Sequence, residues 1–119
     1  MLLRNKDKKT LLQLFSSMGF PFEVLAYGSR VEGSAHEGSD LDLVIRSKNR
    51  EKLPITIFME LKEKIQQSNI PIVVELFDWA RLPESFHRNI NSLHEVLYSN
   101  FETMANEPPV AYKTRKKKK

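Results

Sequence analysis

Residues 25–46 read LAYGSRVEGSAHEGSDLDLVIR, and this stretch decides how the chain is organised. An apolar run, Phe22 to Tyr27, leads into the pair Gly28-Ser29. Ten residues after that pair, Asp40 and Asp42 stand at the head of a second apolar run. Short apolar runs of this length favour strands, so the stretch predicts two strands that each end or begin on polar residues.

Asp40 and Asp42 alternate with the apolar residues of the second run. Side chains alternate between the two faces of a strand, so both carboxylates are expected on one face and the apolar side chains on the other. Neighbouring carboxylates repel and raise each other's pKa. A Mg²⁺ ion relieves this conflict and is commonly held by one or two carboxylates together with substrate phosphates. The pair therefore predicts a metal site.

The turn at Gly28 and Ser29 suits a phosphate. Glycine lets the backbone turn tightly and approach a ligand closely. Ser29 offers a hydroxyl at the start of an expected short helix, Ser29–Gly33, and the free N–H groups at a helix start favour anions. Arg30 follows and could contact a triphosphate, although a solvated loop arginine explains it equally well. We therefore take Gly28, Ser29 and Arg30 as candidate nucleotide-binding residues.

The residues GSRVEGSAHEGSDLDLVI (28–45) resemble the signature of the DNA polymerase β-type nucleotidyltransferase superfamily. Within it, the chain is similar to the minimal nucleotidyltransferase (MNT) proteins, which are typically encoded beside a HEPN-domain partner. The similarity runs from about Phe22 to Tyr98. It implies a polymerase β-like fold, two Mg²⁺ ions, ATP or another NTP as substrate, and a HEPN-domain partner in a toxin–antitoxin module.

The resemblance also implies a third catalytic acid on an adjacent strand. Glu75 stands at that position in the apolar run Ile72–Phe77, where the family more usually has Asp. An acid inside an apolar strand is costly unless it faces a polar cleft, which agrees with this role. Asp78 is the competing candidate, but alternation places it on the opposite face, where capping or surface exposure explains it better. The expected catalytic and metal-binding residues are Asp40, Asp42 and Glu75.

Helices are expected to alternate with the strands along the rest of the chain. Apolar stripes, caps and proline starts predict helix 7–18, strand 22–27, helix 29–33, strand 40–46, helix 54–68, strand 72–77 and helix 83–93. Residues 95–99 fit either a last strand or a continued helix. This order predicts an α/β (α+β) fold, with a small mixed sheet covered by helices mainly on one face and its first two strands antiparallel.

The net charge of +4 over 119 residues belongs to the end of the chain. Lys113–Lys119 holds six basic residues, and without them 13 basic residues face 15 acidic ones, a balance of −2. We expect a nucleotidyltransferase domain over residues 1–107 and a basic, disordered tail over 108–119. Nucleic acid is not an expected partner, except through this tail.

Several classes of protein are excluded by composition. The chain has no cysteine, so it has neither disulfides nor thiolate metal sites, and its three histidines lack zinc spacing. His36 is at most a substrate contact in the loop, and Trp79 and Phe86 are expected in the core or against a partner. No apolar run approaches the roughly 20 residues of a membrane span, and the first residues lack the apolar region of a signal peptide. A cytoplasmic protein without membrane contact is expected.

The predicted function is transfer of NMP, with AMP from ATP favoured, to a hydroxyl acceptor with release of pyrophosphate. In the family that acceptor is a tyrosine of the HEPN toxin, and the transferase is the antitoxin. Two alternatives stay open. The protein could neutralise its partner by binding alone, with a weak or vestigial site, or it could be a transferase that modifies a small antibiotic. A 119-residue chain leaves little room for a second domain to hold such a drug.

Overall fold

The computed structural model describes residues 1–101, so the expected domain boundary at 107 and the tail 108–119 lie outside the described residues. The elements in chain order are α1 (Asn5–Ser16), β1 (Phe22–Tyr27), α2 (Ser29–Glu32), β2 (Leu41–Ser47), α3 (Ile55–Gln66), β3 (Val74–Asp78), the short 3-10 helix η1 (Trp79–Arg81), α4 (Glu84–Ser92) and β4 (Glu95–Ser99). Among residues 1–101, no helix has the length and apolar character needed to cross a bilayer.

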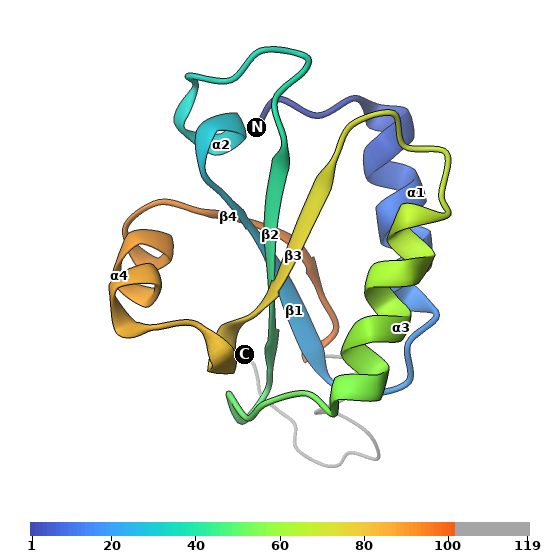
Figure 1. Cartoon of the computed structure of the whole chain (residues 1–119), viewed down its shortest axis with the longest axis vertical. Coiled ribbons are helices and arrows are strands. Elements are labelled where there is room, and N and C mark those ends of the chain that lie inside the picture. Colours follow the sequence, from blue (N-terminus) through green and yellow to red (C-terminus); the bar gives the residue numbers. More distant parts are fainter. Residues whose placement is uncertain (102–119) are drawn as a thin grey trace, which may run out of the picture.

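The four strands form one mixed sheet in the order β3-β2-β1-β4. β1 is antiparallel to both of its neighbours, whereas β2 and β3 are parallel. Parallel neighbours require a crossover, and α3 makes it across one face of the sheet (Figure 1). The predicted mixed sheet and the antiparallel pairing of its first two strands are confirmed.

The two faces of the sheet are covered unequally. One face packs against α1 and α3 and forms the main core, where Phe15, Leu43 and Leu61 have no exposed surface. We call this the core face. The other face carries α4 (Figure 1) and a smaller apolar cluster, to which α4 contributes Ile90. We call it the α4 face. Helices therefore cover mainly one face, as expected.

The ends of most elements differ by one or two residues from the sequence prediction, as element ends commonly do. β3 begins at Val74 rather than Ile72, because its neighbour β2 begins at Leu41, directly opposite Val74. Residues 95–99, which the sequence left undecided, form the edge strand β4 because they pair with β1.

Candidate active site

The register of the sheet brings Asp42 and Glu75 side by side. Asp42 on β2 is the direct partner of Glu75 on β3, and on its other side it is the partner of Tyr27 on β1. Directly paired residues of neighbouring strands point to the same face. All three side chains therefore lie on the α4 face, at the end of the sheet where β1 ends and β2 and β3 begin. Asp40 lies two residues before Asp42 and is exposed.

The carboxylates of Asp40 and Glu75 act electrostatically on Asp42. Partial burial raises the pKa of Asp42 above its ordinary value, and the negative charges of Asp40 and Glu75 raise it further. This arrangement is unfavourable for the protein alone. A bound cation would relieve it, so the charge conflict expected from the sequence is present in the fold.

Tyr27 is a site-facing residue that sequence reasoning missed. Its phenol is half-buried, and burial together with Asp42 and Glu75 raises its pKa to about 12. The hydroxyl therefore stays protonated at neutral pH, so it can donate a hydrogen bond but cannot serve as a base. Period-two alternation along β1 would have found it, because Tyr27 ends the strand on the face opposite to the core.

Gly28 lies against the carboxylate of Asp42, where any other residue would be strained. Its φ of +83° lies in the left-handed region, and a Cβ at this position would stand 2.5 Å from Oδ2 of Asp42. Both facts favour glycine at this position. The next residue, Ser29, is half-buried and begins α2. The turn that was expected to hold phosphate therefore lies directly beside the carboxylate that was expected to hold metal.

Arg30 does not lie where the sequence suggested. Its side chain is only 4% exposed, and its guanidinium donates to the main-chain carbonyls of Leu2, Glu37 and Ser39. The structure does not support the expected contact of Arg30 with a triphosphate, because Nε, Nη1 and Nη2 of its guanidinium already donate to these carbonyls. The reading as a solvated arginine is also wrong, since the side chain is buried.

Asp78 is a cap. It is 3% exposed and accepts hydrogen bonds from the backbone N–H of Leu53 at 2.9 Å and of Ala80 at 3.2 Å. Nε of Arg81 donates to it as well, at 3.2 Å. The capping interpretation is therefore confirmed, and Asp78 is separated from the carboxylates of the α4 face.

The remaining candidates have structural contacts. Nδ1 of His36 accepts a hydrogen bond from the Gly38 N–H at 3.0 Å, within its own loop. Trp79 is buried, stacks on His87 with ring centroids 3.9 Å apart, and carries the Arg46 guanidinium 4.5 Å from its ring centroid. The expectation that Trp79 lies in the core is confirmed. Phe86, in contrast, is 42% exposed.

The donor set suits Mg²⁺ without forming a complete cage. Within residues 1–101, no group of three or more Asp, Glu, His or Cys side chains is close enough to hold a metal ion by itself. Mg²⁺ is seldom bound by such a cage, because it usually takes one or two carboxylates and completes its shell with water and substrate phosphates. The mutual repulsion at Asp42 and the all-oxygen donors fit this ion.

A family model described as "Polymerase beta, Nucleotidyltransferase" matches residues 9–103, most of the chain. The chain belongs to this nucleotidyltransferase family. A Haemophilus influenzae protein described as "Probable protein adenylyltransferase MntA" is 38% identical over 103 residues, which cover 87% of this chain and 84% of that protein. The family resemblance expected from the sequence is thereby confirmed.

Solved structures agree with the nucleotidyltransferase fold. A chain from the crystal structure of a toxin–antitoxin pair with AMP-PNP superposes on this chain with a TM-score of 0.62 at 18% identity. The match covers 84% of this chain and 82% of the other. A tri-AMPylated Shewanella oneidensis HEPN toxin in complex with its MNT antitoxin superposes with a TM-score of 0.60 at 15% identity, over 88% and 82%. At these identities the likeness establishes the fold, and the predicted fold class is confirmed.

Proposed function

We propose that this nucleotidyltransferase moves AMP from ATP onto a tyrosine hydroxyl of a HEPN-domain toxin and so acts as its antitoxin. Two of the similar proteins support the proposal by their descriptions, one as a probable protein adenylyltransferase and one as an MNT antitoxin in complex with an AMPylated HEPN toxin. A third is a toxin–antitoxin complex with an ATP analogue, which favours ATP as the substrate.

One observation in the fold carries the proposal. The direct pairing of Asp42 with Glu75 puts two acids from neighbouring strands together, next to the Gly28–Ser29 turn. A metal-binding pair beside a phosphate-binding turn is what transfer of a nucleotidyl group requires.

The proposed roles follow from position. Asp40, Asp42 and Glu75 would hold Mg²⁺, and Ser29 with the neighbouring N–H groups would hold the β- and γ-phosphates. When bound, Mg²⁺ supplies charge neutralisation on the phosphates. The acceptor oxygen attacks the α-phosphorus, the bond from that phosphorus to the bridging oxygen breaks, and pyrophosphate leaves with the electron pair. Glu75 accepts the hydroxyl proton. Positioning and charge provide the catalysis, and no covalent enzyme intermediate is needed.

An intact-mass measurement of the partner tests the proposal. A HEPN-domain toxin is incubated with the transferase, ATP and Mg²⁺. The proposal predicts a gain of one or more adenylyl groups on tyrosine, which is absent when Mg²⁺ is omitted or when Asp42→Asn replaces the wild type. An unchanged mass of the HEPN-domain protein, with a transferase that is shown to be folded, would contradict the proposal.

Neutralisation by binding alone is the second candidate, and one observation favours it: Arg30, which the sequence offered as a nucleotide-binding residue, is buried and donates to main-chain carbonyls. The double variant Asp40→Asn/Asp42→Asn separates the two functions. Growth protection against the toxin that is lost in this variant supports catalysis, provided that the variant still binds the toxin. Protection that is retained supports binding alone.

A further inference from the structure

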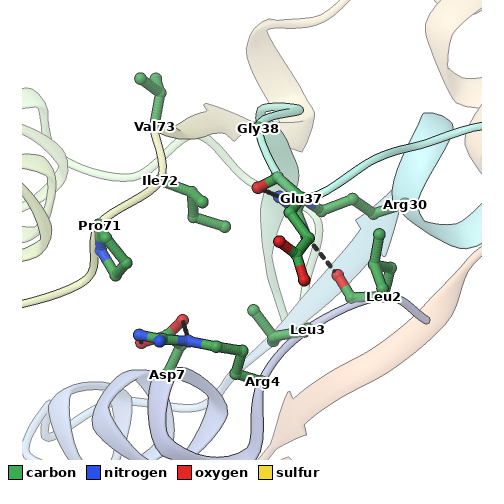
Figure 2. Close-up of a pocket in the computed structure, with 10 residues that line it drawn as sticks. All are labelled: Leu2, Leu3, Arg4, Asp7, Arg30, Glu37, Gly38, Pro71, Ile72 and Val73. Carbon is green, nitrogen blue, oxygen red and sulfur yellow. Dashed lines mark hydrogen bonds and ion pairs between the residues drawn. The ribbon is translucent and has the colours of Figure 1, made fainter.

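Arg30 connects the phosphate-binding turn to the segment before the aspartates. It belongs to α2, one residue after Ser29, and its Nε and Nη2 both donate to the Ser39 carbonyl, at 3.0 and 2.7 Å. Nη2 also donates to the Glu37 carbonyl at 2.8 Å, and Nη1 to the Leu2 carbonyl at 2.6 Å. Figure 2 shows Arg30 beside Leu2 and Glu37, whose carbonyls accept two of these hydrogen bonds. Since Ser39 immediately precedes Asp40, the side chain spans the two halves of the proposed site.

The segment that Arg30 holds is itself a closed turn. The Ser39 N–H donates to the His36 carbonyl at 3.0 Å, and the His36 N–H donates to Oγ of Ser39 at 3.1 Å. The Gly38 N–H donates to Nδ1 of the His36 ring. Residues 36–39 therefore form one hydrogen-bonded unit, and a shift of the Arg30 guanidinium would move that unit and Asp40 behind it.

The other end of the connection is fixed as well. The Leu2 N–H donates to the Arg30 carbonyl at 3.0 Å while the Leu2 carbonyl accepts from its side chain, so main chain and side chain of Arg30 are both anchored. A cavity of about 440 Å³ lies against this anchor, with Asp7 and Arg4 on its far side (Figure 2). The Arg30 charge is thus buried among carbonyls, a position that is costly unless every donor is used.

We propose that Arg30 is a positioning residue that sets the spacing between the Gly28–Ser29 turn and Asp40. It acts through the Ser39 carbonyl and touches neither nucleotide nor metal. Only arginine offers five donors in a rigid fork, which suits several carbonyls that converge from different segments. The inference rests on the proposed function, because it assumes that phosphates at the turn and metal at the aspartates must meet.

A nucleotide-binding experiment separates positioning from direct contact. The affinity for a nonhydrolysable ATP analogue is measured by calorimetry with and without saturating Mg²⁺, and the ratio of the two affinities reports how well turn and aspartates act together. The variants are Arg30→Lys, which keeps the charge but loses the fork, and Arg30→Gln. Arg46→Gln is the matched control, since it removes a partly buried arginine of β2 that pairs with Glu23 at 2.9 Å and contacts no part of the turn.

For both Arg30 variants we expect the Mg²⁺-dependent gain in affinity to fall by about 10-fold, because small displacements of reacting groups carry large penalties. The metal-free affinity should stay within about 2-fold, since the fork touches no phosphate. Arg46→Gln, measured below its own melting temperature, should keep the full gain. A gain that is unchanged in Arg30→Lys and Arg30→Gln would overturn the inference. So would a metal-free affinity that falls as far as the metal-bound one, because that result places Arg30 on the phosphate.

If the Arg30 variants do not fold, the double variant His36→Ala/Ser39→Ala is measured instead. It removes hydrogen bonds within the same turn, and both residues lie outside the helices and strands. We expect its Mg²⁺-dependent gain to fall by about 3-fold, and an unchanged gain would overturn the inference. A wild type that shows no Mg²⁺-dependent gain would instead contradict the proposed function, so the two failures are distinguishable.

Discussion

The same strands build both faces of the sheet, but the core face carries buried apolar side chains and the α4 face carries the acidic residues of the candidate site. On the core face, β2 contributes Leu41, Leu43 and Ile45, all without exposed surface. On the α4 face the same strand contributes Asp42, whose carboxylate is raised in pKa by its surroundings. The core face therefore provides most of the stability, while the α4 face adds to its smaller apolar cluster an electrostatic conflict that a bound cation would relieve. Adjacent residues of one strand should respond oppositely to mutation.

The largest expected effect is on the α4 face. Asp42→Asn removes the charge that is proposed to bind metal without changing the side-chain volume, so AMP transfer should fall by about 10³-fold or more. The rate of AMP incorporation into a HEPN-domain toxin, the proposed acceptor, measures this fall. The fold should persist, as an unchanged circular-dichroism spectrum would show. A variant that keeps a tenth of the wild-type rate would remove Asp42 from the catalytic set.

The neighbouring residue on the core face should show the converse. Leu43→Ala opens a cavity in the main core and should lower the free energy of unfolding by about 3 kcal/mol. Urea denaturation measures this loss. At a temperature where the variant remains folded, its AMP transfer rate per folded molecule should stay near that of the wild type. A rate that collapses together with Asp42→Asn would mean that the two faces are not independent.

Glu75 tests how tightly the α4 face is specified. Glu75→Asp shortens the arm by one methylene but keeps the charge, so we expect the transfer rate to change by less than about 10-fold. Glu75→Gln should lower the transfer rate far more, because it removes the proposed proton acceptor and metal ligand. Equal rates for Glu75→Gln and the wild type would show that Glu75 takes no part in the reaction.

The smallest effect is on stability, and it has an unusual sign. The folded-state pKa of Asp42 is raised above 3.8, so the folded protein binds this proton more tightly than the unfolded chain does. That contribution to stability is present below pH 3.8 and is lost as the pH rises through the folded-state pKa. Asp42→Asn should therefore raise the melting temperature of the metal-free protein by a few degrees at neutral pH, with the gap closing as the pH falls towards 4.

Added Mg²⁺ and an ATP analogue supply the control for this stability effect. They should raise the melting temperature of the wild type much more than that of Asp42→Asn, because binding to the folded state alone stabilises it. A metal-free variant that melts below the wild type at neutral pH would show that Asp42 has a structural role instead.

The sequence predicted what depends on local pattern. β1 was predicted with the bounds that the structure has, and alternation placed Asp40 and Asp42 away from the core because the apolar residues that alternate with them, Leu41 and Leu43, belong there. It could not give the register that sets Glu75 opposite Asp42, since this depends on how α3 carries the chain from β2 to β3.

Arg30 was misread for a related reason. An arginine after a Gly-Ser turn offers the same local signal whether it meets a phosphate or three carbonyls. Those carbonyls come from residues 2, 37 and 39, which only the folded chain brings together. Gly28 was predicted in part: its backbone freedom was expected from its type, but its close approach to Asp42 appears only in the fold.

The central claim is that acids from β2 and β3 hold one metal centre beside the Ser29 turn. A crystal structure with Mn²⁺ in place of Mg²⁺ and a nonhydrolysable ATP analogue tests it directly, because Mn²⁺ is located by its anomalous scattering. We predict that the anomalous peak will place a Mn²⁺ ion within bonding distance of the carboxylates of Asp42 and Glu75, with the β- and γ-phosphates of the analogue at Ser29. A peak that lies elsewhere, or a Glu75 carboxylate turned away from a metal held by Asp42, would contradict the claim.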